Sequence, residues 1–209
     1  MSSEKRSYEL RARAERQQET RLRIIEATVA LHQQVGPART TVAEIARRAR
    51  VQRLTVYNHF PEEEELFAAC QRHFLAQHPL PDFAPALALE DPAERTRVAL
   101  RALYRSYRER APMTGKVLRD RSALPALDSL LERTMDAQQS RLAAALSAGF
   151  RARGPRRERL RALIGLALDF WTWHRLDRES LDDGSAAELM ADVIGAAAQD
   201  DRVHGSPPS

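Results

Sequence analysis

The chain has 209 residues, of which 43% are hydrophobic and 30% are charged, and its net charge is +4. This length and hydrophobic content are enough to bury a core without disulfides or metal ions, which excludes an intrinsically disordered chain. The longest uncharged stretch, Ala27 to Ala38, is too short to span a membrane, the N-terminus lacks an apolar signal segment, and a single cysteine cannot form an intramolecular disulfide, so we expect a cytoplasmic protein.

Helix-favouring residues dominate the composition. Alanine, leucine, arginine and glutamate are abundant, whereas aromatic residues make up 6% and glycine occurs eight times. These preferences favour helix along nearly the whole chain. We therefore predict an all-α fold.

The positive charge is concentrated near the N-terminus. Between Thr20 and Phe60 the chain has seven arginines and two glutamates, a net +5, which exceeds the charge of the whole chain. A basic segment of this kind is typical of a module that binds nucleic-acid phosphates, and a solvated helix face is the alternative explanation.

The first predicted elements are two helices joined by a short loop. Apolar residues at helical spacing predict a helix over 21–35, which Gly36-Pro37 ends. Thr41, followed three residues later by Glu44, has the pattern of a capping box. This pattern predicts a short helix that runs to about Ala49.

A third helix is predicted over 53–59, with Val56, Tyr57 and Phe60 packed back on the first two helices. Two short helices joined by a short turn have the helix-turn-helix plan, in which the second helix enters the major groove of DNA. Its N-terminal side chains are placed to meet base edges, and these are Gln52, Arg53, Thr55 and Asn58.

This region resembles the DNA-binding domain of TetR-type (TetR/AcrR) transcriptional regulators. The resemblance covers about Thr20 to Phe74 and rests on Thr41-Val42-Ala43-Glu44-Ile45-Ala46, Val51, Thr55-Val56-Tyr57-Asn58-His59-Phe60-Pro61, Glu64 and Leu66-Phe67. It implies a homodimer that binds a palindromic operator in double-stranded DNA and responds to a small-molecule effector. We expect Thr41, Tyr57 and His59 to contact phosphates.

Three residues depart from the pattern of the resembled family. Arg50 stands where a turn glycine is usual, so a residue other than glycine is expected to adopt a positive φ. Leu54 replaces a small residue, and Glu63 replaces a lysine near a phosphate. The glutamates at 62–65 suit the start of a fourth helix but would repel a nearby phosphate.

A fourth helix and a proline-rich segment follow the predicted DNA-binding helices, which form the head of the molecule. They separate this head from a larger helical body that begins near Pro92. A buried stripe of Leu66, Phe67, Cys70 and Phe74 is expected to couple the two. The predicted divisions are an N-terminal arm over 1–19, a DNA-binding domain over 20–78, a linker over 79–91, a ligand-binding and dimerisation domain over 92–200 and a tail over 201–209. Body helices are predicted over 92–110, 113–121, 125–152, 156–177 and 185–199, separated at Pro112, Pro125, Gly154-Pro155 and Asp183-Gly184.

The last two predicted body helices are apolar on more than one face. One core needs less apolar surface than this, so the second face is expected to pair with a two-fold copy, as the last two helices of the resembled family do. A purely intramolecular core is the alternative. The predicted interface residues are Leu166, Phe170, Leu189, Val193 and Ala197.

An effector pocket in the body is implied by the resemblance alone. Its candidate lining is Tyr104, Tyr107, Met113, Val117, Leu131, Met135 and Phe170, with Asp169 and His174 as polar anchors. Each of these residues also fits an ordinary core or surface role. We expect Asp169 to pair with His174 or Arg175, and the effector to be mostly apolar.

Other chemistry has little support in the sequence. No metal-binding histidine pattern, nucleophile motif or phosphate-binding glycine loop occurs, so we expect no enzyme, no cofactor and no metal. Cys70 is expected to be a structural thiol. The favoured function is a ligand-responsive transcriptional regulator, usually a repressor, and the alternative is an architectural DNA-binding protein without a small-molecule switch.

Overall fold

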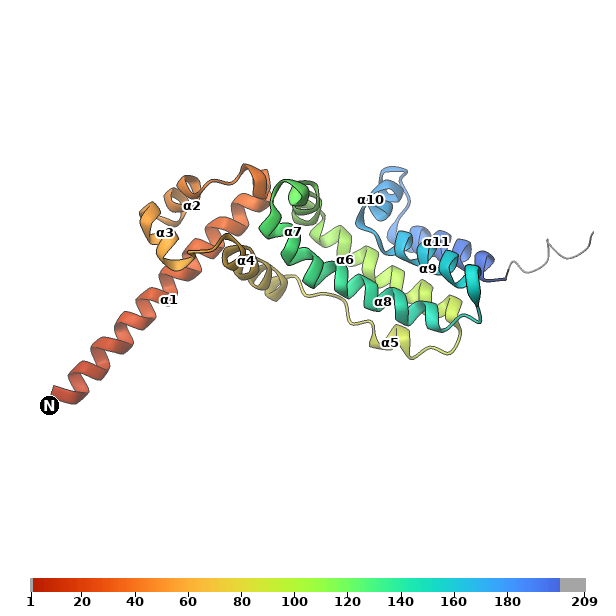
Figure 1. Ribbon diagram of the computed structural model, residues 1–209, viewed down its shortest axis with the longest axis horizontal. Coiled ribbons are helices and arrows are strands. Elements are labelled where there is room, and N and C mark those ends of the chain that lie inside the picture. The colour runs from red at the N-terminus through yellow and green to blue at the C-terminus, as the bar shows by residue number, and fades with distance from the viewer. Residues whose placement is uncertain (1, 200–209) are drawn as a thin grey trace, which may run out of the picture. The chain divides into compact units, whose positions relative to one another are not determined.

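The computed structural model describes residues 2–199, and every regular element in that range is helical, as predicted (Figure 1). The predicted tail lies outside the described residues. The α-helices are α1 (Ser2–Val35), α2 (Val42–Ala49), α3 (Arg53–His59), α4 (Glu63–Gln77), α5 (Ala84–Leu87), α6 (Pro92–Asp120), α7 (Pro125–Leu131), α8 (Ala137–Ala148), α9 (Gly154–Leu168), α10 (Phe170–Arg178) and α11 (Asp183–Gln199). No described helix is both long and apolar enough to cross a membrane.

The chain folds into two compact units. The head unit comprises the chain up to Pro79 together with Pro112–Leu131, and the body unit comprises Leu80–Ala111 and the chain from Glu132 onward. Helix α6 starts in the body unit and ends in the head unit. The segment Pro112–Leu131, which the sequence places in the body, therefore packs with the head.

The head unit has one hydrophobic core. Helix α1 packs against α2 and α4, and α4 packs against α7. The core includes the predicted stripe of Leu66, Cys70 and Phe74, and Met113 from α6 joins it. Phe67 of the same stripe is also buried.

Helix α1 is longer than the sequence patterning predicts. It begins at Ser2 rather than near residue 21, so the predicted N-terminal arm is helical. Most side chains over 7–19 are exposed, including Tyr8 and Leu10. This segment has no apolar stripe to reveal the helix, but its alanine, arginine, glutamate and glutamine residues have high helix propensity.

The predicted break at Pro112 is wrong. Helix α6 continues through Pro112 to Asp120. A proline removes one backbone hydrogen bond from a helix. Burial of Met113 and the packing of Val117 against the head core stabilise the helix beyond this point.

Two predicted long helices are each divided. A π-helical turn, Glu132–Asp136, separates α7 from α8, and the second helix breaks at Asp169, which has extended backbone. The helices on both sides of each break bury apolar side chains, so the hydrophobic pattern continues through the break. The spacing of apolar residues alone therefore does not show where one helix ends and the next begins. Beyond Asp169 the apolar faces change, so Phe170 is buried and Trp171 is exposed.

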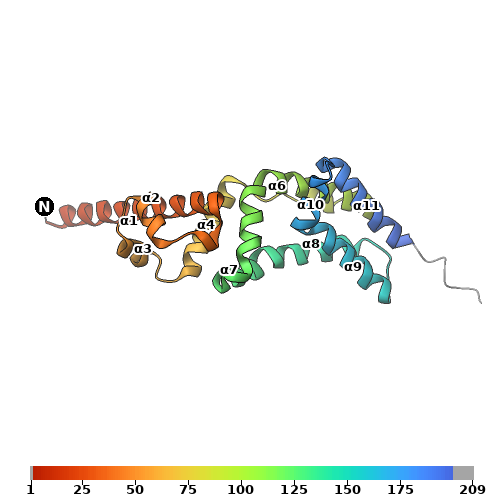
Figure 2. The ribbon, with the colours of Figure 1, turned by 90° about the horizontal axis from the view of Figure 1, so that it is seen from above.

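Helix α9 is the centre of packing in the body unit. Helix α9 packs against α8, α10 and α11, and α9 and α11 lie side by side in both views (Figures 1 and 2). Its core contains fully buried Leu100 and Tyr104 of α6, Leu146 of α8, Ile164 of α9 and Ile194 of α11.

Candidate functional site

The turn between α2 and α3 has the geometry of a helix-turn-helix motif. Helix α2 ends at Arg50, which has φ 55° and ψ 48°, so the predicted positive φ is confirmed. The Arg50 N–H donates to the carbonyl oxygens of Ala46 and Arg47. A residue other than glycine in this conformation carries a strain of about 1 kcal/mol.

The start of α2 is fixed by the predicted capping box. Thr41 Oγ1 accepts a hydrogen bond from Glu44 N–H at 3.2 Å, and a Glu44 carboxylate oxygen accepts from Thr41 N–H at 3.2 Å. The Thr41 hydroxyl also donates to this carboxylate at 2.8 Å. Two backbone N–H groups that a helix start leaves without partners are thus satisfied.

Helix α3 is anchored by its inner face and by its C-terminus. Val56 and Phe60 are buried. The Arg21 guanidinium of α1 lies 4.0 Å from the centre of the Phe60 ring and donates to the His59 carbonyl oxygen at 2.6 Å. Arg21 was counted in the basic segment, but its role in holding α3 was not predicted, because it joins residues 38 positions apart.

The outer face of α3 presents the predicted base-contacting residues together. Gln52, Arg53 and Asn58 are exposed, and Thr55 is half-buried. Gln52 precedes the first turn of α3, and its side chain makes no capping hydrogen bond. Tyr57 is 53% exposed, so its predicted packing on the first two helices is wrong and its side chain lies on the outer face.

His59 is the titratable group of this surface. Burial, and then the nearby Arg21, lower the pKa of His59 below its ordinary value. The imidazole is therefore neutral near pH 7. A neutral imidazole can donate one N–H to a phosphate oxygen, and a phosphate at this position would favour the protonated ring.

The start of α4 places an acidic surface beside this face. Glu63, Glu64 and Glu65 form the first turn of α4. An open groove of about 520 Å³ lies here, lined by Arg21, Glu62, Glu64, Glu65, Ala68 and Arg72. The glutamates suit the positive end of the helix dipole, but they repel a phosphate that approaches this edge.

The end of α6 is attached to the end of α1 within the head unit. Asp120 accepts a hydrogen bond from Ala38 N–H at 3.0 Å, and Arg119 donates to the Val35 carbonyl oxygen at 3.2 Å. The hydrogen bond from Arg119 lowers the pKa of Asp120. Gly36 has φ 93°, and a side chain there would clash with Arg119 and Asp120.

His32 is buried in this part of the head. Loss of hydration lowers its pKa to about 4, against a smaller opposing effect of Asp120. His32 is therefore neutral in the folded protein at neutral pH. The sequence did not indicate that His32 is buried and neutral, because its position only fits the apolar spacing of α1.

In the body unit, two buried tyrosines satisfy the end of α9. Tyr104 Oη donates to the Ala167 carbonyl oxygen at 2.8 Å, and Tyr107 Oη donates to that of Leu168 at 2.6 Å. The Gln139 amide, which was not among the predicted residues, donates to Tyr107 Oη at 2.9 Å. These contacts stabilise the helix end that the break at Asp169 creates.

Aromatic rings gather beside this helix end. Phe170 is fully buried, with its ring centre 5.4 Å from those of Tyr107 and Trp173 and 5.9 Å from that of His174. The predicted pairing of Asp169 with His174 or Arg175 is wrong. Asp169 caps α10 by accepting from Trp171 N–H at 2.7 Å and Thr172 N–H at 3.2 Å, and Arg175 pairs with Glu179.

The structure does not bring the predicted effector-pocket residues together within one unit. Met113 and Val117 of α6 and Leu131 of α7 belong to the head unit. The other six belong to the body unit, where Tyr107, Phe170 and His174 are neighbours and Met135 lies in the π-helical turn.

Helices α9 and α11 keep an apolar surface that the body core does not cover. Leu166 is 53% exposed, Leu189 44% and Val193 42%. Ala197 is half-buried. Phe170, also predicted for the dimer interface, contributes no surface because it is fully buried.

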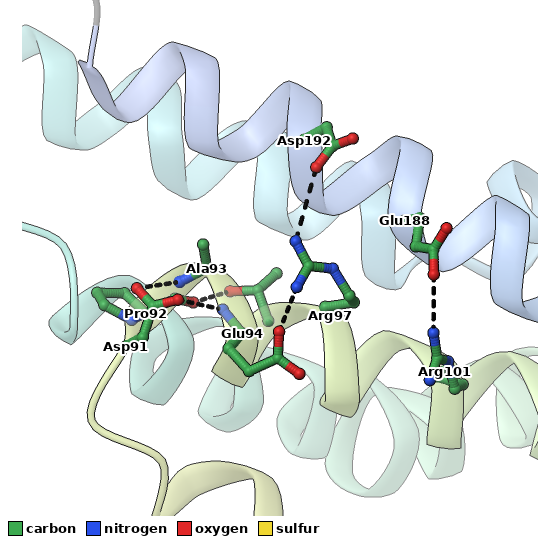
Figure 3. Close-up of polar contacts among 9 residues, drawn as sticks. Asp91, Pro92, Ala93, Glu94, Arg97, Arg101, Glu188 and Asp192 are labelled. Carbon is green, nitrogen blue, oxygen red and sulfur yellow. Dashed lines mark hydrogen bonds and ion pairs between the residues drawn. The ribbon is translucent and has the colours of Figure 1, made fainter.

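Ion pairs to α6 orient α11 (Figure 3). Arg101 pairs with Glu188 at 2.9 Å, and Arg97, which also pairs with Glu94, lies 3.8 Å from Asp192. Exposed pairs contribute little stability. Glu188 and Asp192 nevertheless lie on the side of α11 that faces α6, so the adjacent Leu189 and Val193 point elsewhere.

Comparisons with known proteins agree with this description. Residues 24–70 match the family model of bacterial regulatory proteins, tetR family. A comparison with curated proteins gave no match.

Several solved structures share the fold. A TetR-like transcriptional regulator from Rhodococcus sp. RHA1 has 21% identity and a TM-score of 0.59 over 87% of this chain and 96% of its own. A second transcriptional regulator from Rhodococcus sp. RHA1 has 21% identity and a TM-score of 0.55, over 86% of this chain and 96% of its own. A TetR transcription regulator from Haloarcula marismortui ATCC 43049 has 18% identity and a TM-score of 0.55, over 87% of this chain and 97% of its own.

At these identities the solved structures establish the fold, and the matched segment supplies the identity of the DNA-binding domain. Residues 24–70 therefore match a tetR-family DNA-binding domain, and the described chain has the fold of the TetR-like transcriptional regulators to which it is similar.

Proposed function

We propose that the protein is a homodimeric repressor that binds a palindromic operator and leaves it when a small apolar effector binds the body unit. The observation that carries the DNA-binding part is the outer face of α3. Exposed Gln52, Arg53 and Asn58 lie there on a helix held by buried Val56 and by Arg21. Such a rigid helix with polar side chains fits the major groove.

Base contacts are assigned to Gln52, Arg53, Thr55 and Asn58, and phosphate contacts to Thr41, Tyr57 and His59. Selection from a random pool of DNA duplexes tests this assignment. Replacing Arg53 with alanine should weaken binding to the selected operator by about 1 to 3 kcal/mol and relax preference at one position in each half-site. An unchanged preference in this variant contradicts the base contact.

The Tyr57→Phe variant is the matched control for phosphate contact. It should weaken binding to all sequences about equally and reduce the salt dependence, because a phosphate contact carries no base information.

Dimerisation is assigned to the exposed apolar face of α9 and α11. Two copies of Leu166, Leu189 and Val193 facing each other across a two-fold axis would remove apolar area from water at about 25 cal/mol per Å², before the cost of association. The Val193→Asp variant should sediment as a monomer. Leu10→Asp adds the same charge to exposed α1 and should remain a dimer, whereas a dimeric Val193→Asp variant places the interface elsewhere.

The effector site is assigned to the body unit beside the aromatic cluster of Tyr107, Phe170 and Trp173. Apolar lining favours an uncharged, mostly apolar ligand, since an unpaired charge there costs several kcal/mol. The buried Ser106 hydroxyl has no hydrogen-bond partner in the described part of the chain, and it is available to a polar atom of the ligand.

An effector that binds the free protein about 2.7 kcal/mol more tightly than the DNA-bound protein lowers operator affinity a hundredfold. Screening apolar compounds by thermal shift and then by operator release tests this switch. Stabilising compounds that never alter DNA affinity would instead favour an architectural DNA-binding protein.

A further inference from the structure

The most exposed leucine of the described chain lies on α3, the helix that we propose enters the major groove of DNA. Leu54 is the second residue of α3 and is 66% exposed. Its sequence neighbours on either side, Arg53 and Thr55, are residues to which base contacts are assigned. Covering this large apolar side chain with a binding partner would remove it from water, which lowers the free energy.

The helical period places Leu54 on the outermost face of α3. Leu54 and Asn58 are one turn apart, and both lie nearly opposite Val56, the residue that α3 buries in the head core. When α3 lies in the major groove, the face opposite its buried side points at the base edges. Leu54 therefore lies beside Asn58, closer to the bases than to the phosphates.

Few features of the major groove suit an apolar side chain. Guanine, cytosine and adenine present hydrogen-bond donors and acceptors there, whereas thymine also presents its 5-methyl group. A leucine against donors and acceptors would remove their water without replacing the hydrogen bonds, which is unfavourable. Against a thymine methyl, both partners lose contact with water.

We propose that Leu54 is a specificity-determining residue that contacts the 5-methyl group of a thymine in each half-site of the operator. The inference rests on the proposed function, because it requires α3 to enter the major groove. It adds a base contact to the polar ones, and it gives a role to the larger side chain that departs from the family pattern.

Replacing thymine with deoxyuridine tests the contact at the level of one methyl group. Operators are first selected with the parent protein, and each invariant thymine is then replaced singly while affinity is measured at constant salt. One thymine per half-site should show a loss of about four-fold, equivalent to burial of one methylene group. Replacement in both half-sites should give about sixteen-fold.

The Leu54→Ala variant identifies the protein partner of that methyl group. It should bind the thymine operator about as weakly as the parent protein binds the uracil operator, and it should lose nothing further with uracil. Leu54→Met keeps an apolar side chain of similar length and should restore most of the uracil penalty. Leu80→Ala removes another exposed leucine and should keep the full penalty.

Leu54 is not a core residue, so the alanine variant should have the circular dichroism spectrum and melting temperature of the parent protein. Selected operators without an invariant thymine, or a full uracil penalty in Leu54→Ala, would overturn the proposal while leaving DNA recognition intact. If no duplex is selected at all, the proposed function itself fails.

Discussion

The head and body units stabilise the ends of their helices in different ways. In the head, Thr41 and Glu44 cap α2 across three residues, and Arg50 closes it within one turn. In the body, the end of α9 is stabilised by Tyr104 and Tyr107, which lie more than sixty residues earlier in the chain. The helix ends of α2 are therefore local features, whereas the end of α9 depends on tertiary packing.

The largest expected effect follows from removing one of these distant contacts. Replacing Tyr104 with phenylalanine leaves the buried Ala167 carbonyl oxygen without its donor, which should lower the free energy of unfolding by about 1 to 3 kcal/mol. Urea denaturation measures this change. Tyr8→Phe, which alters an exposed tyrosine, should have no effect, and an equally stable Tyr104→Phe variant would show that α9 needs no distant donor.

The second prediction concerns pH and the head unit. The folded-state pKa of His32 is about 4, below its ordinary 6.5, so stability is fully present above pH 6.5 and is lost as the pH falls from 6.5 to about 4. Between pH 7 and pH 4.5 this loss should be roughly 2 kcal/mol. The His32→Gln variant should lose correspondingly less over this range.

The matched control for this effect is His73→Gln, which changes a histidine at the surface of α4. Asp120 acts in a separate range, because its lowered pKa makes its contribution disappear only below about pH 3.8. If the His32→Gln variant loses as much stability between pH 7 and 4.5 as the parent protein, His32 is not the buried neutral group.

The local cap of α2 should matter less than the distant cap of α9. Thr41→Ala removes the hydroxyl that accepts from Glu44 N–H, and such losses are typically about 1 kcal/mol. Thr41→Ser keeps the hydroxyl and should stay close to the parent stability. A loss in Thr41→Ala larger than that in Tyr104→Phe would reverse the comparison between the two units.

The smallest effect should be a gain in stability. Arg50→Gly relieves the strain of a positive φ, and the greater backbone entropy of glycine in the unfolded chain offsets part of it, leaving roughly 0.5 kcal/mol. Arg50→Ala keeps the strain, so it separates the backbone effect from the loss of the guanidinium. Equal melting temperatures for the two variants would mean that φ at this position costs nothing.

The head was largely predictable because its signals are short-range. The capping box, the turn at Arg50 and the stripe of α4 involve residues within one or two turns of each other. The exposure of Tyr57 was mistaken because an aromatic residue beside Val56 fits a buried pattern equally well. The role of Arg21 was missed because it depends on how α1 and α3 pack.

The body was less predictable, because its helix boundaries do not follow from the hydrophobic pattern and the prolines alone. Pro112 predicts a helix end, but the packing of Met113 and Val117 in the head core stabilises a continuous α6. Asp169 lies within an apolar run and looked like a buried carboxylate in need of a charged partner. Its oxygen instead satisfies two backbone N–H groups of α10, a local solution that the continuous hydrophobic pattern concealed.

The discontinuous head unit has a consequence for synthesis on the ribosome. The segment Pro112–Leu131 completes the head, but it is made only after 80–111, which belongs to the body. At about 5 to 20 residues per second, translation of 80–131 takes roughly 3 to 10 s. Throughout this interval the nascent α1 and α4 expose the apolar surface that Met113 and α7 later cover, and transiently exposed surface of this kind is what chaperones bind.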